Sequence, residues 1–182
     1  MARSPFPCSA VVATVCCLVF SQLAAQTSPG VLIHPELKRL SPMVGVWAGK
    51  AAIRPTQFRK GSESPLKATF RWVLSGQHME GDLTYAVGGS PYHALLLLSY
   101  DFHARQFVAY WADNFSSKPT IFRGAFTGDT LVLEGTSTED GRTSLAELRI
   151  NVGAAGWTLI SSGDAMGDMT EGARLTASRP KN

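Results

Sequence analysis

Residues 65–74 read PLKATFRWVL, and apolar and polar side chains alternate in this stretch from Leu66 to Trp72. Successive side chains of a β-strand point to opposite faces of a sheet. The stretch therefore has one apolar face and one face that carries Lys67 and Arg71, which is the pattern of a half-buried strand. It predicts one strand of an antiparallel sheet.

The same period of two recurs along the chain on both sides of this stretch. Turn signals such as Gly88-Gly89, Thr127-Gly128-Asp129, Glu139-Asp140-Gly141 and Gly163-Asp164 separate the segments. One segment, 92–100, is apolar on both faces, which predicts a strand that is covered on both sides. The further predicted strands are 45–54, 77–87, 92–100, 106–113, 120–126, 130–136, 142–152, 156–162 and 172–179.

The connections between these segments are short. Parallel pairing needs long crossovers, for which the chain has no room, so the strands must form an antiparallel meander. A long meander around one small core closes, because an open sheet would leave exposed edges. We therefore predict an all-β fold, an up-and-down barrel of about ten antiparallel strands with an interior cavity. A β-sandwich is the alternative, although it usually needs longer connections.

Residues 34–44 are the one convincing helical piece after the N-terminal region. Pro35 suits the first turn of a helix, and Leu37 and Leu40 fall on one face. Pro42 is expected to end the helix. A single short helix before a run of strands suits the role of a plug for one barrel end.

The first residues have the order of a secretory signal peptide. Arg3 supplies positive charge, an apolar run too short to span a bilayer occupies residues 10–20, and small and polar residues follow. A cut after Ala25 would make residues 1–25 the signal peptide, with a leader at 26–33 and a single domain at 34–182. The predicted location is the periplasm or the cell exterior. A buried N-terminal helix and a lipoprotein signal are the alternatives.

Cysteines and charge exclude several classes of site. Cys8, Cys16 and Cys17 all lie in the predicted signal peptide, so the mature chain would have no disulfide and no cysteine nucleophile. The formal net charge is only +3, and the basic residues are scattered. The chain is therefore predicted to bind no nucleic acid and, without a second long apolar run, to have no membrane span.

Two stretches resemble a known family. Residues 40–49 (LSPMVGVWAG) resemble the opening of calycin-type barrels, in which a Gly and then a Trp lie on the first strand. Residues 99–135 (SYDFHARQFVAYWADNFSSKPTIFRGAFTGDTLVLEG) resemble the uncharacterised, largely bacterial domain-of-unknown-function family 1579. The shared pattern is a Tyr-Asp, a strand ending in Trp-x-Asp, a Ser-rich loop and a Gly-Asp turn. The resemblance implies a calycin-like or lipocalin-like barrel without assigned chemistry.

A more distant similarity of shape is to the nitrobindins, barrels that bind haem through a His near the C-terminus. This chain departs from that pattern, because every His lies at position 103 or earlier. Haem ligation of that kind is not expected, and no cofactor is predicted.

His78, Glu80 and Asp82 share one face of a predicted strand. They could form a metal or acid–base site, or they could be the solvent-facing side of a strand whose other face is apolar. A metal site needs three or more ligands, and His93 is the only further candidate ligand nearby in the sequence. The solvent-facing interpretation is favoured, and no metal site is predicted.

Five residues are candidates for contact with a ligand: Trp47, Tyr85, Trp111, Asp113 and Arg123. Trp111 would line the cavity with Asp113 at its mouth, since ligands enter barrels there. Alternatively, Trp111 fills the core and Asp113 begins a turn through its side chain. An inward-pointing Arg123 could meet a ligand carboxylate, although its apolar neighbours favour an outward position.

Three functions follow from these patterns. The first is an exported barrel that binds a small, mainly apolar ligand. The second is a hydrolase or isomerase that uses His78, Glu80 or Asp113 inside the barrel. The third is a structural or protein-interaction barrel with a filled interior. The ligand's identity, the oligomeric state and the presence of enzymatic activity stay open.

Overall fold

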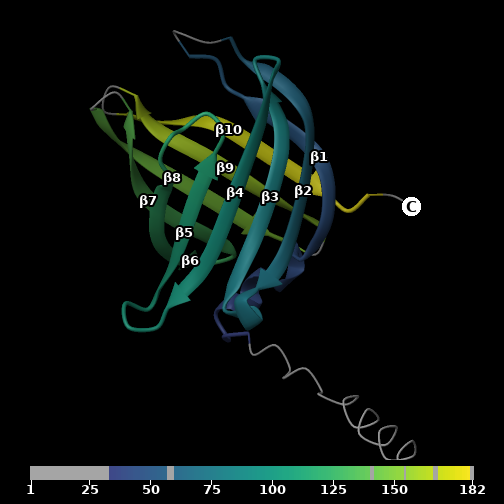
Figure 1. The fold of residues 1–182 in the computed structure, drawn as a ribbon, viewed down its shortest axis with the longest axis vertical. Coiled ribbons are helices and arrows are strands. Elements are labelled where there is room, and N and C mark those ends of the chain that lie inside the picture. Colours follow the sequence, from purple (N-terminus) through teal and green to yellow (C-terminus); the bar gives the residue numbers. More distant parts are fainter. Residues whose placement is uncertain (1–32, 57–59, 140–141, 154, 166–167, 181–182) are drawn as a thin grey trace, which may run out of the picture. The chain divides into compact units, whose positions relative to one another are not determined.

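The computed structural model describes residues 33–56, 60–139, 142–153, 155–165 and 168–180. The predicted signal peptide, with Cys8, Cys16 and Cys17, lies outside the described residues. Within them the chain forms one β-barrel (Figure 1). No helix in this part of the chain is long and apolar enough to cross a membrane.

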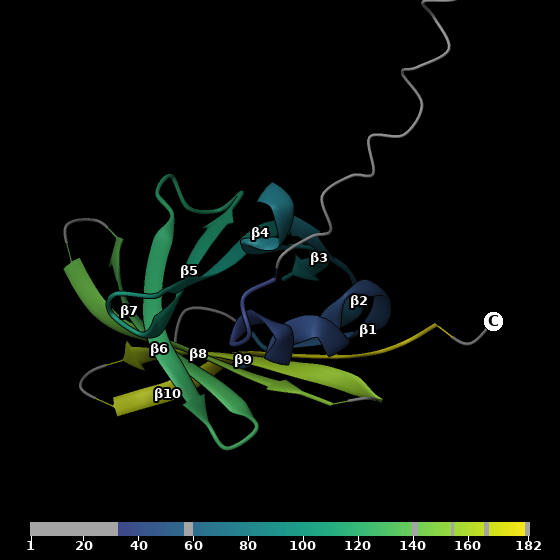
Figure 2. The same cartoon turned by 90° about the horizontal axis from the view of Figure 1, so that it is seen from below.

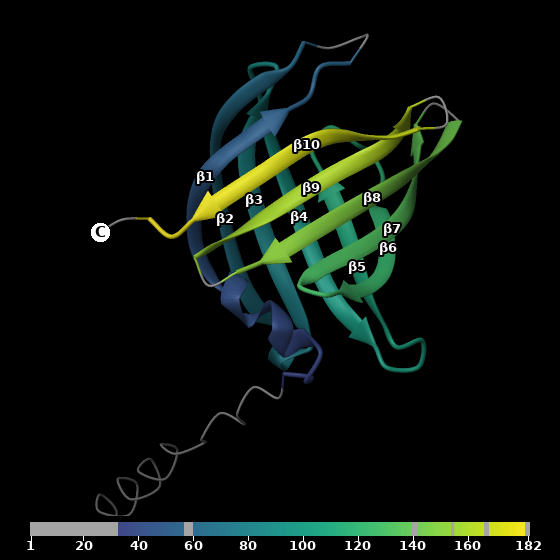
Figure 3. The same ribbon diagram turned by 180° about the vertical axis from the view of Figure 1, so that it is seen from behind.

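The described residues form ten strands, and each pairs antiparallel with its neighbour in sequence. β1 also pairs with β10, in a register that sets Ala48 opposite Ser178, and this pairing closes the barrel (Figure 3). The predicted antiparallel barrel is confirmed. The strands are β1 (Gly45–Ile53), β2 (Ser62–Val73), β3 (His78–Val87), β4 (Ser90–Asp101), β5 (Gln106–Asp113), β6 (Thr120–Thr127), β7 (Thr130–Glu139), β8 (Arg142–Val152), β9 (Gly156–Ala165) and β10 (Asp168–Ser178).

The apolar face of each strand points into the barrel. On β2, Leu66, Ala68 and Phe70 are buried, and Lys67, Thr69 and Arg71, which alternate with them, are exposed. Trp157 meets Phe70 edge to face across the interior, with ring centroids 5.3 Å apart. The alternation read from the sequence therefore assigns the inner and outer faces correctly. The largest fully buried side chains include Trp47, Phe70, Phe107, Leu83, Leu96 and Leu131.

A short 3-10 helix, η2 (Leu37–Met43), closes the end at which β1 begins (Figure 2). Leu37, Leu40 and Met43 are all buried there, which agrees with the predicted plug. Pro42 lies inside η2 rather than ending it, so that prediction was wrong. The fixed φ of proline is compatible with a helical turn, and at position 42 proline removes only its own backbone N–H as a donor.

One side chain of η2 and one of β1 hold the helix against the barrel. The Arg39 guanidinium donates to the Gly128 carbonyl at 2.7 Å and lies 3.7 Å from the centre of the Phe126 ring. The Trp47 indole donates to the Met43 carbonyl. The plug is thus tied to β1 and to the β6–β7 turn.

Two further predictions were wrong. Gly163 and Asp164 were expected in a turn, but they belong to β9 and pair with Thr170 and Met169. The segment 92–100 was expected to be covered on both faces, yet Leu95 on the outer face of β4 is 44% exposed. Its inner face is buried, because every second residue from Ala94 to Leu98 points into the core.

Candidate functional site

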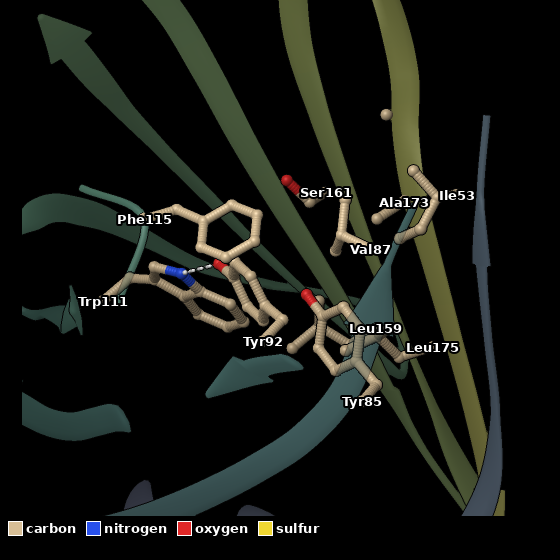
Figure 4. A pocket seen from close by; sticks show the side chains of 11 residues that line it. Ile53, Tyr85, Val87, Tyr92, Trp111, Phe115, Leu159, Ser161, Ala173 and Leu175 are labelled. Carbon is tan, nitrogen blue, oxygen red and sulfur yellow. Dashed lines mark hydrogen bonds between the residues drawn. The ribbon is translucent and has the colours of Figure 1, made fainter. Parts of the chain in front are cut away.

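A cavity of about 190 Å³ opens at the end of the barrel opposite η2 (Figure 4). Its lining comes from the ends of β1, β3 and β5, from the start of β4, from the loop that follows β5, and from the middle of β9 and β10. These segments are far apart in the chain, and closure of the barrel brings them together. The lining residues are Ile53, Tyr85, Val87, Tyr92, Trp111, Phe115, Leu159, Ser161, Gly172, Ala173 and Leu175.

Four aromatic side chains form one wall of the cavity. The rings of Tyr85 and Tyr92 lie 4.6 Å apart between centroids. Phe115 meets Tyr92 edge to face at 5.2 Å. Trp111 lies beside Tyr92, so the four rings form a continuous surface in Figure 4.

Aliphatic side chains form the rest of the lining. Ile53, Val87, Leu159 and Leu175 contribute branched apolar groups, and Figure 4 shows Ile53 and Val87 across from the aromatic rings. None of the described residues that line the cavity carries a charge. The cavity therefore offers apolar surface and a few hydroxyl groups.

Trp111, Tyr92 and Asp113 form a hydrogen-bonded group next to the cavity. The indole Nε1 of Trp111 lies 3.2 Å from the Tyr92 hydroxyl and 3.2 Å from Asp113 Oδ2, and it donates to both. Burial, assisted by the neighbouring Tyr85, raises the pKa of Tyr92 far above its ordinary value of 10.0. Tyr92 therefore stays uncharged, as the apolar surroundings require.

Asp113 and Asn114 fix the loop that carries Phe115. Asp113 Oδ1 accepts from the backbone N–H of Phe115 at 2.9 Å and from that of Ser116 at 2.8 Å. Asn114 exchanges two hydrogen bonds with the backbone of His93 on β4. Phe115 is 54% exposed, yet these bonds hold its ring over the mouth of the cavity.

The structure places the five predicted ligand-contact residues in three different parts of the barrel. Tyr85 and Trp111 line the cavity, and Asp113 supports it through Trp111. Trp47 lies near η2 at the closed end, fully buried. Arg123 lies on the outer face of β6, where it lines a groove of about 370 Å³ together with residues of β3, β4 and β5.

Sequence reasoning missed Tyr92, Phe115 and Ser161. Ser161 continues the inward face of Trp157 and Leu159, so the alternation of β9 contained the signal. Tyr92 is the first residue of the predicted strand 92–100, which is apolar on both faces. The alternation therefore did not indicate to which face Tyr92 points. Phe115 lies in a loop, where no periodic pattern exists.

The acidic and histidine residues of β3 lie on the outside of the barrel. Glu80 pairs with Arg71 at 2.9 Å, and Asp82 pairs with His93 at 3.0 Å. The proposed placement of His78 and Glu80 inside the barrel was wrong, because Met79, Gly81 and Leu83 occupy the inner face. No cluster of metal-ligating side chains occurs among the described residues.

Comparison with known proteins identifies a family and a fold. A family model described as "Protein of unknown function (DUF1579)" matches residues 34–151, in agreement with the resemblance seen in the sequence. No curated protein matches the chain. Thirteen chains of solved structures match. One is the crystal structure of Rv2717c from M. tuberculosis, with 16% identity, a TM-score of 0.61, and coverage of 82% of this chain and 100% of that one. At this identity the similarity concerns the fold alone.

Proposed function

This chain belongs to the family described as protein of unknown function (DUF1579), and from that premise we propose that it binds a small, mainly apolar ligand in the open end of its barrel. The observation that carries the proposal is the uncharged cavity of about 190 Å³ lined by aromatic and aliphatic side chains. Concave, mostly apolar pockets with a few polar groups are typical of small-molecule sites.

Apolar side chains at the cavity give the driving force. Removing apolar surface from water stabilises a complex by about 25 cal/mol for each Å² buried. The walls are supported from behind, since Asp113 and Asn114 fix the loop of Phe115 and the barrel strands hold Leu159 and Leu175. A preformed site loses little free energy to ordering when a ligand binds.

Filling the cavity tests the proposal. The purified full chain would be titrated calorimetrically with two uncharged probes, toluene and n-hexanol. Ala173→Phe places a ring in the cavity and is expected to abolish binding of either probe. Ala112→Phe adds the same ring at an exposed position on β5 and should leave binding unchanged. The proposal fails if the unmodified protein binds neither probe, or if Ala173→Phe has no effect.

The enzymatic alternative has less support. His78 and Glu80 lie outside the barrel, away from the cavity. Both oxygens of Asp113 accept hydrogen bonds, from Trp111 and from the backbone of the loop. An acid–base role for Asp113 would require breaking bonds that hold the mouth of the cavity together.

We also propose that the protein is exported to the periplasm or secreted. The support is the sequence order of Arg3, the apolar run 10–20 and the small residues up to Ala25. Protein recovered from the periplasm or the medium should have the mass of a chain that begins at Gln26. Val12→Arg interrupts the apolar run and should leave the unprocessed chain inside the cell. Recovery of only the full-length chain from the cell interior would contradict export.

A further inference from the structure

We propose that the ligand is an uncharged aromatic molecule of about one ring with a single hydrogen-bonding group, and that the Ser161 hydroxyl selects for that group. This inference rests on the proposed function, because it names the ligand class of the same cavity. Four properties of the cavity support it: volume, shape, an unpartnered hydroxyl and the absence of charge.

The volume limits the ligand to about one ring. An apolar cavity of about 150 Å³ accommodates benzene. The present cavity has about 190 Å³, which leaves room for a ring with a small substituent. Drug-sized ligands occupy pockets of roughly 300 to 1,000 Å³. Large tetrapyrroles and long acyl chains therefore do not fit without rearrangement.

The shape of the cavity favours a flat molecule. In Figure 4 the rings of Tyr92, Trp111 and Phe115 lie on one side of the cavity, and Ile53 and Val87 lie across from them. Tyr85, Leu159 and Leu175 lie together below. A planar ring can contact both sides at once. Aromatic pairs also gain stability from edge-to-face and offset packing beyond the area they bury. A flexible chain of similar size would lose more conformational freedom on binding.

Among the hydroxyl groups at the cavity, we assign the contact with the ligand's polar group to Ser161. Its side chain lies on the inner face of β9, between Leu159 and the pairing partner Ala173, and makes no hydrogen bond within the described part of the chain. By contrast, Ser64 and Ser99 both bond to backbone groups of the barrel. A hydroxyl in an apolar wall has an unused donor and acceptor, so it favours a ligand that supplies the partner.

Charged ligands are disfavoured. No lining side chain among the described residues would pair with an ion, and Asp113 already uses its oxygens on Trp111 and on the loop backbone. An ion would lose its hydration without compensation. The raised pKa of Tyr92 is consistent with these surroundings, which disfavour charge.

The role of the Ser161 hydroxyl is tested by measuring the affinity of two ligands for three forms of the full chain. Para-cresol differs from toluene by one hydroxyl group, and Ser161→Ala removes the proposed partner. We expect the unmodified protein to bind para-cresol about fivefold more tightly than toluene, the ratio given by one neutral hydrogen bond. Ser161→Ala should abolish this preference while toluene binds as before, which also shows that the cavity is intact. Ser162→Ala, on the outer face of the same strand, should keep the preference. An unchanged preference in Ser161→Ala would overturn the role of Ser161.

Shape and charge are tested with three more probes. We expect n-hexanol, the anion para-toluate and the cation benzyltrimethylammonium each to bind more weakly than para-cresol. If n-hexanol binds as tightly as para-cresol or more tightly, the ligand is not specifically aromatic. If Ala173→Phe then abolishes the binding of n-hexanol, the proposed binding of an apolar ligand in this cavity still holds. Tight binding of the cation would instead indicate an aromatic cage, and tight binding of the anion would also contradict the uncharged class. Failure of every probe would overturn both proposals.

Discussion

Asp113 and Ser161 are polar residues at the same end of the barrel, and their partners give them different roles. Asp113 accepts hydrogen bonds from its own loop and from Trp111, so it is a structural support. Ser161 has no such partner among the described residues. The sequence predicted that Asp113 lies at the mouth of the barrel, because Trp111 and Asp113 are two residues apart and share one face of a strand. The alternative interpretation, in which Asp113 begins a turn through its side chain, is confirmed by the bonds from the Phe115 and Ser116 backbone N–H groups. The bond from Trp111 was not predicted.

Gly81 is a position where an added side-chain carbon would meet another core side chain directly. It lies on the inner face of β3 opposite Phe70, and a Cβ at this position would overlap the Phe70 ring. We expect Gly81→Ala to lower the free energy of unfolding by about 1 to 3 kcal/mol, the usual cost of overpacking a core. Urea denaturation monitored by fluorescence would measure the change.

Gly163→Ala is the matched control for Gly81→Ala. Gly163 is also a strand glycine, but the nearest atom to an added Cβ is 3.9 Å away. The added methyl group should be neutral or slightly stabilising, because glycine loses more conformational freedom on folding. Equal effects of the two substitutions would contradict the packing explanation.

At the scale of the elements, the period of two predicted the strands and their inner faces, but their ends were less certain. Gly163 and Asp164 have turn-forming side chains, yet β9 continues through them because β10 extends far enough to pair with both. Local propensity is overridden here by pairing between strands. Likewise, the apolar residues around Leu40 predicted the plug, although Pro42 lies within it.

The plug should contribute strongly to stability through Leu40, which is fully buried. Leu40→Ala is expected to lower the free energy of unfolding by about 2 to 5 kcal/mol, the range for buried leucines. Lys38→Ala changes an exposed residue of the same helix and should have little effect. Thermal unfolding followed by circular dichroism would compare them. A small loss in Leu40→Ala would show that η2 is dispensable for the barrel.

Glu171 links β10 to the end of β1 and should make stability depend on pH. It bonds to Arg174 at 2.6 Å and to Arg54 at 3.1 Å, and these bonds lower its pKa below the ordinary 4.5. A carboxyl whose pKa is lowered in the folded state stabilises the protein above its unfolded pKa. This contribution is lost as the pH falls through the folded pKa.

Glu171→Gln should therefore be less stable than the unmodified protein at pH ~7 by less than about 1 kcal/mol, because the arginines are largely exposed. The difference should shrink as the pH falls below the ordinary value of 4.5. Urea denaturation across this range would measure it. Glu63→Gln is the control, since the Glu63–Lys50 contact is 3.9 Å and both side chains are exposed. A difference that grows in acid would contradict the assignment.

For the whole molecule, stability comes from packing and from closure of the sheet. β1 pairs with β10, so every strand has two neighbours and the barrel has no edge. No described residue is a cysteine, because Cys8, Cys16 and Cys17 all precede them. The barrel must therefore hold together without a disulfide.

A reducing agent should leave the stability of the barrel unchanged. We expect the same urea midpoint with and without dithiothreitol, because no cross-link restricts the unfolded chain. The midpoint is measured by tryptophan fluorescence in both conditions. A lower midpoint in dithiothreitol would show that the N-terminal cysteines contribute to folding stability.

The sequence by itself determined the antiparallel strands, the face of each strand that is buried and the presence of a short plug. These features are local, since a period of two and short turns leave only pairing between neighbours. Tertiary structure alone decided that Tyr92, Phe115 and Ser161 meet Tyr85 and Trp111 around one cavity. Closure of the barrel and the stagger of its strands determine which residues lie at the same height along the barrel axis. This relation joins distant segments, so it cannot be inferred from a local sequence pattern.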